Sequence, residues 1–215
     1  IGVSEKDLRV AASKIYLSGM YEEVIDLLEG ISLEVQNQRL ILVLSKSLYN
    51  VGLYERCIDS CRQLLEANPG DSDALSLVIR SKKKLGNTRD EETIEALKIS
   101  LELGVIRPSE AYFLSRLMVE SGDWDLAGRA LGILFEDDEG DITDRHVVLK
   151  SKILSKIEGD ESARKWLTSN DDGSSVVISK ALASLYHRLH EDEMALEVRK
   201  RILKILWYKS CFVFF

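Results

Sequence analysis

The side chains best suited to chemistry in this chain are its histidines and cysteines. His187 and His190 lie three residues apart, which places both imidazoles on one face of a helix, a spacing that suits a metal ion. No recognisable motif supplies a third ligand, so two solvated helix residues are the simpler interpretation. Cys57 and Cys61 are four residues apart and are expected to face the core, where buried small side chains explain them better than a redox pair.

Two polar segments complete the candidates for chemistry. FEDDEGDITD, residues 135–144, carries the oxygen ligands that calcium prefers, but it lacks the EF-hand glycine and terminal glutamate spacing, and a solvated loop between helices explains it better. NDDGSS, residues 170–175, is interpreted as another loop and as the best candidate for a mobile break. The chain contains no GxGxxG, P-loop or GxSxG pattern. We therefore expect no enzymatic activity, no cofactor and no metal site.

The composition favours a helical globular protein. The 215 residues carry 29 Lys and Arg against 36 Asp and Glu, a net charge of −7, and 45% are hydrophobic, which excludes wholesale disorder and a membrane protein. Two prolines are few, and many Leu, Ala, Glu and Lys favour helices over a turn-rich β-sandwich. An odd count of three cysteines indicates a reducing compartment, so we expect a cytoplasmic protein.

The two ends of the chain give further expectations. The sequence begins IGVSEKDLRV, with no basic stretch before an apolar one, so it predicts no signal peptide but a processed or excised product. The longest apolar run, LKILWYKSCFVFF, is too short to span a bilayer, and we expect no membrane partner.

The elements that position all these residues follow an internal repeat. Turn-like positions recur every 31 to 37 residues, each between two stretches with the apolar period of a helix. A glycine there supplies the left-handed backbone that ends the first helix, so each unit is predicted to be helix, tight turn, helix. The positions are Gly19, Gly52, Gly86, Gly122 and Gly159, with His190 in the sixth.

The spacing within one unit carries a family resemblance. The clearest unit is residues 37–71. Its regularly spaced apolar, small, aromatic and proline residues are Leu44, Leu48, Gly52, Tyr54, Cys57, Cys61, Leu64 and Pro69. This pattern resembles the tetratricopeptide repeat (TPR), and the phase extends over roughly residues 5–206. The resemblance implies an all-α, right-handed α-solenoid of five to six helix-turn-helix repeats, about twelve helices without a sheet. The first helices would line a concave groove, and Tyr54 and Trp124 would pack over their turns and be largely buried.

The face of the first helices has an unusual charge. With the turn glycine as position 15 of a 34-residue unit, positions 2, 5, 9, 12 and 13 share one side of the first helix. Eleven of these thirty positions are Lys or Arg and two are Asp or Glu, although the chain as a whole is acidic. The candidate partner-binding residues on this face are Arg9, Tyr16, Arg39, Lys46, Tyr49, Arg80, Lys83, Lys84, Tyr112 and Arg116.

Two interpretations of this basic face stay open. Lys and Arg on a first helix can serve solubility alone. Alternatively, the clustered charge attracts an acidic segment of a protein or peptide, with the tyrosines as amphipathic anchors. Some TPR proteins clamp a C-terminal carboxylate with basic residues on the first helices. Here Asp73 and Leu77 replace the basic pair of the third unit, so a receptor for chaperone tails is not expected.

The last nine residues, from Trp207, are apolar for a chain end. We divide the chain into a TPR-like domain, residues 1–207, and an apolar tail, residues 208–215. The tail is a cap that folds back, a cut edge where a further repeat continues, or an exposed patch that docks a partner or makes an oligomer. In each case we expect it to be covered, by the preceding helix pair or by another molecule.

Three classes of function follow. The first is a non-enzymatic protein-interaction scaffold that binds an acidic segment in the concave groove. The second is the repeat domain of a larger multidomain enzyme, where it recruits or orients the substrate. The third is RNA binding by helical repeats, against which the net charge of −7 argues. We favour the scaffold.

Overall fold

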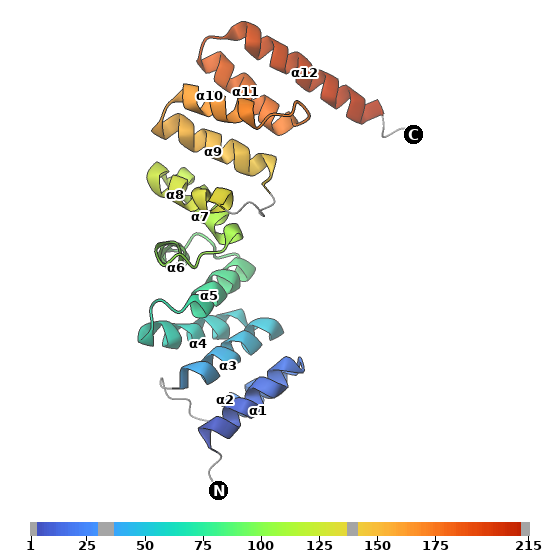
Figure 1. Cartoon of the computed structure of the whole chain (residues 1–215). Helices are drawn as coiled ribbons and strands as arrows, with labels where there is room; N and C mark the ends of the chain where they lie inside the picture. Colours follow the sequence, from blue (N-terminus) through green and yellow to red (C-terminus); the bar gives the residue numbers. More distant parts are fainter. Residues whose placement is uncertain (1–3, 30–36, 137–141, 212–215) are drawn as a thin grey trace. The chain divides into compact units, whose positions relative to one another are not determined.

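The computed structural model describes residues 4–29, 37–136 and 142–211. Over these ranges the chain forms twelve helices and no strand (Figure 1). The chain divides into two compact units, residues 1–106 and 107–215, with six helices described in each. The predicted all-α helical-repeat architecture and the expected number of helices are therefore confirmed.

The first unit is built from three helix pairs. Its helices are α1 (Glu5–Leu17), α2 (Tyr21–Glu29), α3 (Gln38–Val51), α4 (Tyr54–Ala67), α5 (Ser72–Leu85) and α6 (Glu91–Glu102). Each helix packs against the next, and the first helices α1, α3 and α5 also contact one another in that order (Figure 1). The first helices therefore form a continuous layer within this unit.

The second unit repeats the same arrangement. Its helices are α7 (Pro108–Ser121), α8 (Trp124–Glu136), α9 (Asp144–Ile157), α10 (Asp160–Ser169), α11 (Val176–Arg188) and α12 (Asp192–Cys211). Consecutive helices pack together, and α9 contacts both α7 and α11. Three first helices again form one layer.

The turns between paired helices have the backbone that the glycine pattern predicts. Gly52, Gly86 and Gly122 end their helices at φ values of 91°, 79° and 85°. His190, which occupies the sixth glycine position, has φ 61° and is the single non-glycine residue with positive φ in the described part of the chain. The left-handed conformation is thus kept at this turn even where the residue type does not favour it.

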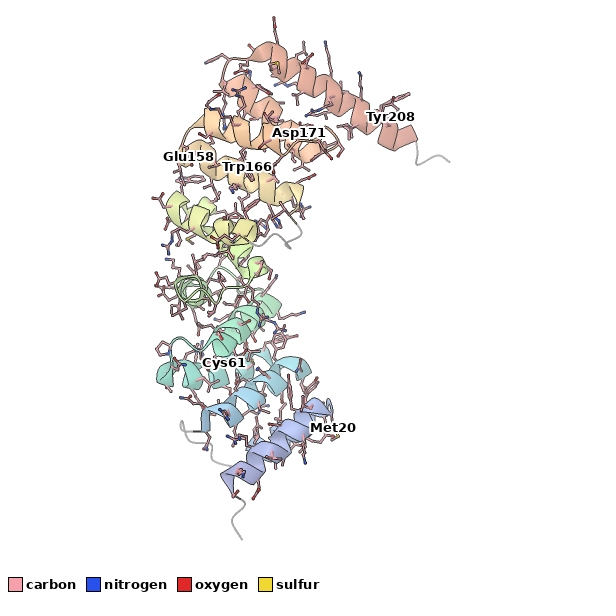
Figure 2. The ribbon with its side chains drawn as sticks, viewed as in Figure 1. Met20, Cys61, Glu158, Trp166, Asp171 and Tyr208 are labelled. Carbon is pink, nitrogen blue, oxygen red and sulfur yellow. The ribbon has the colours of Figure 1, made fainter. Side chains whose placement is uncertain are left out.

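The small residue of each second helix lies in the core. Cys57 and Cys61 are completely buried, and Cys61 lies inside the first unit (Figure 2). Ala127 and Ala195 occupy the position equivalent to Cys57 and are also buried. The interpretation of Cys57 and Cys61 as core residues is therefore confirmed by their burial. A small side chain at this position lets the paired helices approach closely.

The aromatic residues that follow the turns are less buried than expected. Tyr54 lies edge-on against Tyr49, with ring centroids 5.5 Å apart, and both rings are half-buried. The Trp124 ring is approached by the ammonium groups of Lys152 and Lys156, 6.0 and 5.8 Å from its centroid. Tyr54 and Trp124 are both partly exposed, so the expectation that they are largely buried is met only in part. At Trp124 the reason is that long polar side chains, which stay hydrated, cover part of the ring.

The C-terminal segment continues the last helix. α12 passes without a break through the boundary drawn between residues 207 and 208 and ends at Cys211. Trp207 and Tyr208 are 63% and 59% exposed, and Tyr208 is labelled on the last turns of α12 in Figure 2. The preceding helix pair therefore does not cover these two side chains, and residues 212–215 lie outside the described ranges.

The third turn is longer than the others and is held by buried charge. Asp90 caps α6 by accepting the amide N–H of Thr93, and the ammonium of Lys82 lies 2.6 Å from Asp90 and 2.7 Å from Glu92. Arg62 reaches Glu92 from α4. Hydrogen bonds from Arg62, and then from Lys82, outweigh burial and lower the pKa of Glu92. Burial alone would raise the pKa of Asp90, but the bonds from Lys82 and Thr93 lower it.

The Lys82 network predicts a pH-dependent loss of stability. Lys82→Met keeps an apolar stem but removes both ion pairs, so we expect it to lower the free energy of unfolding at pH 7 by about 1–2 kcal/mol, less than a fully buried pair because the carboxylates are partly solvated. Carboxylates with a lowered pKa stabilise the fold above their unfolded pKa and lose that contribution as pH falls through the folded value. The difference between the variant and the original chain should therefore shrink in urea titrations below about pH 4. An equal difference at pH 7 and pH 3 would contradict this account.

The turn backbone predicts that two glycine substitutions have opposite effects. Gly122→Ala forces a Cβ into φ 85° and should destabilise the protein by about 1–2 kcal/mol, although there is open space around it. Gly132 lies inside α8, also faces open space and lacks a positive φ, so Gly132→Ala should stabilise by about 0.5–1 kcal/mol. Urea titration of both variants tests the signs. A gain in stability from Gly122→Ala would show that the turn does not need its left-handed residue.

Candidate protein-binding face

Eight of the ten candidate residues lie on the layer of first helices in the first unit. We call them the first-helix face: Arg9, Tyr16, Arg39, Lys46, Tyr49, Arg80, Lys83 and Lys84. They come from α1, α3 and α5. Tyr112 and Arg116 belong to α7 of the second unit and are described by themselves.

Contacts between neighbouring first helices join the predicted positions. The Asn50 amide donates to the Tyr16 hydroxyl over 3.4 Å, from α3 to α1. The Arg80 guanidinium lies 4.3 Å from the centre of the Tyr49 ring, from α5 to α3. Partners about one repeat apart in sequence therefore meet in space, and these contacts link Tyr16, Tyr49 and Arg80 across neighbouring first helices.

Not every cation of this face is available to a ligand. The Lys46 ammonium binds the Asp73 carboxylate at 2.9 Å, and both side chains are partly exposed. Arg80 is stacked on Tyr49. Arg39, Lys83 and Lys84 are exposed and make no ion pair with a described residue, and the same holds for the half-buried Arg9. Sequence counting therefore overstates the charge offered to a partner, because it cannot tell a paired lysine from an unpaired one.

A cleft opens between α1 and α3 on this face. Its volume is about 490 Å³, within the range usual for ligand pockets. Three of its lining residues are cationic, four are apolar or aliphatic, and none of them is acidic. They are Arg9, Val10, Ser13, Lys14, Leu17, Arg39, Leu42 and Val43.

In the second unit, Tyr112 and Arg116 form a small cluster with His146. The Tyr112 ring lies edge-on to the imidazole of His146 on α9, with centroids 4.6 Å apart, and the Arg116 guanidinium is 6.0 Å from the Tyr112 centroid. Burial lowers the pKa of His146. His146 occupies a first-helix position equivalent to those counted above, so the second unit has its own aromatic and basic surface.

Two ion pairs that sequence reasoning did not find join a second helix to the preceding repeat. Arg56 of α4 pairs with Glu29 of α2, beside a cavity of about 380 Å³ between α2, α3 and α4. In the second unit Arg201 of α12 pairs with the nearly buried carboxylate of Asp171 (Figure 2), beside a cavity of about 510 Å³. In the sequence, these ion pairs could have been predicted from opposite charges that lie 27 to 30 residues apart.

The residues considered first for chemistry form no metal site within the described ranges. The His187 imidazole lies 3.1 Å from the Asp192 carboxylate, while His190 forms the turn. Within the described ranges no three His, Cys, Asp or Glu side chains are grouped so as to hold a metal ion. Half of the acidic segment 135–144 lies outside those ranges, at residues 137–141. A search of the described helices finds none that is long and apolar enough to span a membrane.

Comparison with solved structures identifies the fold. The chain is similar to YrrB, described as a TPR protein with an unusual peptide-binding site, with a TM-score of 0.64 and 16% identity over 86% of this chain and 91% of that one. It is also similar to MamA AMB-1, with a TM-score of 0.60 and 18% identity over 80% and 93% of the two chains. For MamA 41-end from Desulfovibrio magneticus RS-1, the TM-score is 0.58, with 14% identity over 80% and 96%.

These likenesses show the architecture of the chain. No protein-family model matches the sequence, and no curated protein matches it at a significant level. At these levels of identity the likeness concerns the fold. The chain has the TPR-like helical-repeat fold, and the resemblance seen in the sequence is confirmed.

Proposed function

We propose that this chain is a non-enzymatic protein-interaction scaffold whose first-helix face binds an acidic segment of a partner protein. The observation that carries the proposal is the group of cations on α1, α3 and α5 that make no ion pair with a described residue: Arg9, Arg39, Lys83 and Lys84. They lie on the same layer as the half-exposed rings of Tyr16 and Tyr49. A carboxylate-rich segment supplies the charge that this surface lacks.

The two kinds of residue on this face have separate roles in binding. Each solvated ion pair with a ligand contributes about 0.2–1 kcal/mol and weakens as salt screens it. The tyrosines contribute contact area that salt does not affect. The face therefore holds its partner through several weak contacts, and affinity depends on how many the segment makes at once.

The fold supports a binding role without enzymatic chemistry. YrrB, which shares the fold, is described as having an unusual peptide-binding site. Tyr112 and Arg116 of the second unit are proposed as a separate contact surface, because an aromatic ring beside an exposed guanidinium suits the same acidic chemistry. A cytoplasmic location remains a prediction from the cysteine content.

The role of the unpaired lysines is tested by neutralising them in the full chain. We expect Lys83→Gln with Lys84→Gln to weaken the binding of a labelled Asp- and Glu-rich peptide roughly threefold to tenfold and to flatten its salt dependence, measured by fluorescence anisotropy. Glutamine is chosen over glutamate because both lysines lie in the last turn of α5, where a negative charge would oppose the helix dipole. Lys165→Gln with Lys200→Gln, two exposed lysines of α10 and α12, is the matched control.

The paired lysine gives a test in the opposite direction. Asp73→Asn removes the internal partner of Lys46, so it should strengthen binding of the same acidic peptide at low salt. Equal affinity of all these variants at every salt concentration would mean that the basic charge of this face serves solubility alone.

A further inference from the structure

The cleft between α1 and α3 lacks a carboxylate that is present at the equivalent position between α3 and α5. Between α3 and α5, Lys46 binds Asp73. The equivalent positions one repeat earlier are Ser13 on α1 and Arg39 on α3, and both line the cleft. The first step thus has a cation where the second has an acid, and no described side chain neutralises it.

The position of Arg39 in its helix strengthens the case for an anion. Arg39 is the second residue of α3, whose first turn contains no acidic residue. The positive end of a helix dipole disfavours a cation and favours an anion, so local helix preference does not explain an arginine here. Arg9 and Lys14 line the same cleft, which adds two further positive charges at close quarters.

The remaining walls of the cleft are apolar and open to solvent. Leu17 is 82% exposed and Val10 is 45% exposed, while Leu42 and Val43 are half-buried. Large aliphatic groups are costly to keep in water. A ligand that covers them gains from burial as well as from charge.

We infer that this cleft recognises a large aliphatic side chain flanked by carboxylates within an extended protein segment. The aliphatic group lies against Leu17, Leu42 and Val43, and the carboxylates pair with Arg9 and Arg39. The inference rests on the proposed function and narrows it, since it names the residue pattern that the first-helix face selects rather than negative charge in general.

The first test compares two peptides. One is a labelled peptide of Asp, Glu and Ser with a single central Leu, and the other has Ser in place of that Leu. We expect the leucine peptide to bind the full chain about tenfold more tightly, and this ratio should persist at high salt because burial of a leucine is not screened. A phosphoserine peptide with the same central Leu tests whether phosphate serves as well as carboxylate. If it alone binds, the assignment of carboxylates is overturned.

The second test supplies the missing carboxylate from the chain itself. Ser13→Asp places an acid beside Arg39, as Asp73 lies beside Lys46, and should weaken the leucine peptide roughly fivefold or more. Ser13→Asn introduces a side chain of nearly the same size as aspartate but without its charge, so it should leave the affinity unchanged. Arg39→Gln at an exposed position should reproduce the loss, and circular dichroism melting confirms that each variant is folded.

The outcomes separate this inference from the broader function. If both peptides bind equally, or Ser13→Asp has no effect, while Lys83→Gln with Lys84→Gln still weakens binding, the first-helix face binds acidic segments but the cleft does not select the aliphatic residue. If neither peptide binds at millimolar concentration, the proposed function and this inference both fail.

Discussion

No helix pair in this protein can bury its own apolar stripe, and the rest of the structure depends on that constraint. Leu28 of α2, Leu40 of α3 and Leu64 of α4 are almost completely buried because each helix is covered by its neighbours along the chain. The core is therefore a series of clusters, each shared by three or four consecutive helices. Stability in such an array is the sum of contacts between neighbouring repeats. The surroundings of a surface residue are therefore set by the adjacent repeat and not by distant parts of the chain.

Polar ties between repeats follow from the same constraint. On the first helices they join Tyr16 to Asn50 and Lys46 to Asp73, and in the second unit Asp144 of α9 to Ser175, the N-cap of α11. Asp160 of the second helix α10 pairs with Arg188 of α11. Glu29–Arg56 and Arg62–Glu92 join second helices, and Asp171 of the loop between α10 and α11 pairs with Arg201 of α12. The rings of Phe135 and Trp166 make an aromatic contact between α8 and α10. Two of these ties use Tyr16 and Lys46, which the sequence alone assigns to a partner. The binding surface that we propose consists of the cations that these ties leave unpaired.

The sequence was sufficient for the repeat but not for the pairing of its side chains. Helical period and glycine spacing depend on local backbone preference and on burial, which act at every repeat, so even the left-handed His190 was placed correctly. The state of Lys46 depends on one carboxylate from the next repeat, and the half-burial of Trp124 depends on lysines of α9. The continuation of α12 to Cys211 lies in a segment whose apolar residues suit a helix, a cap or an interface equally.

Helix dipoles explain part of the placement of charge along the helices. α2, α4, α6, α8, α10 and α12 all begin with acidic residues in the first turn. α1, α5, α9 and α11 carry basic residues in the last turn. Both placements stabilise the helices themselves, by about 0.3–1 kcal/mol for each charge.

The helix dipoles divide the cations of the first-helix face into those that stabilise their own helix and those that do not. Lys83 and Lys84 end α5 and stabilise it whether or not a partner binds. Arg39 begins α3, where the dipole opposes it, and has no ion pair with a described residue to offset that cost. A cation kept against the preference of its own helix, beside exposed leucine and valine side chains, needs an explanation from outside the helix. The acidic partner that we propose would supply one, and under that proposal the most selective part of the face lies at the first two repeats.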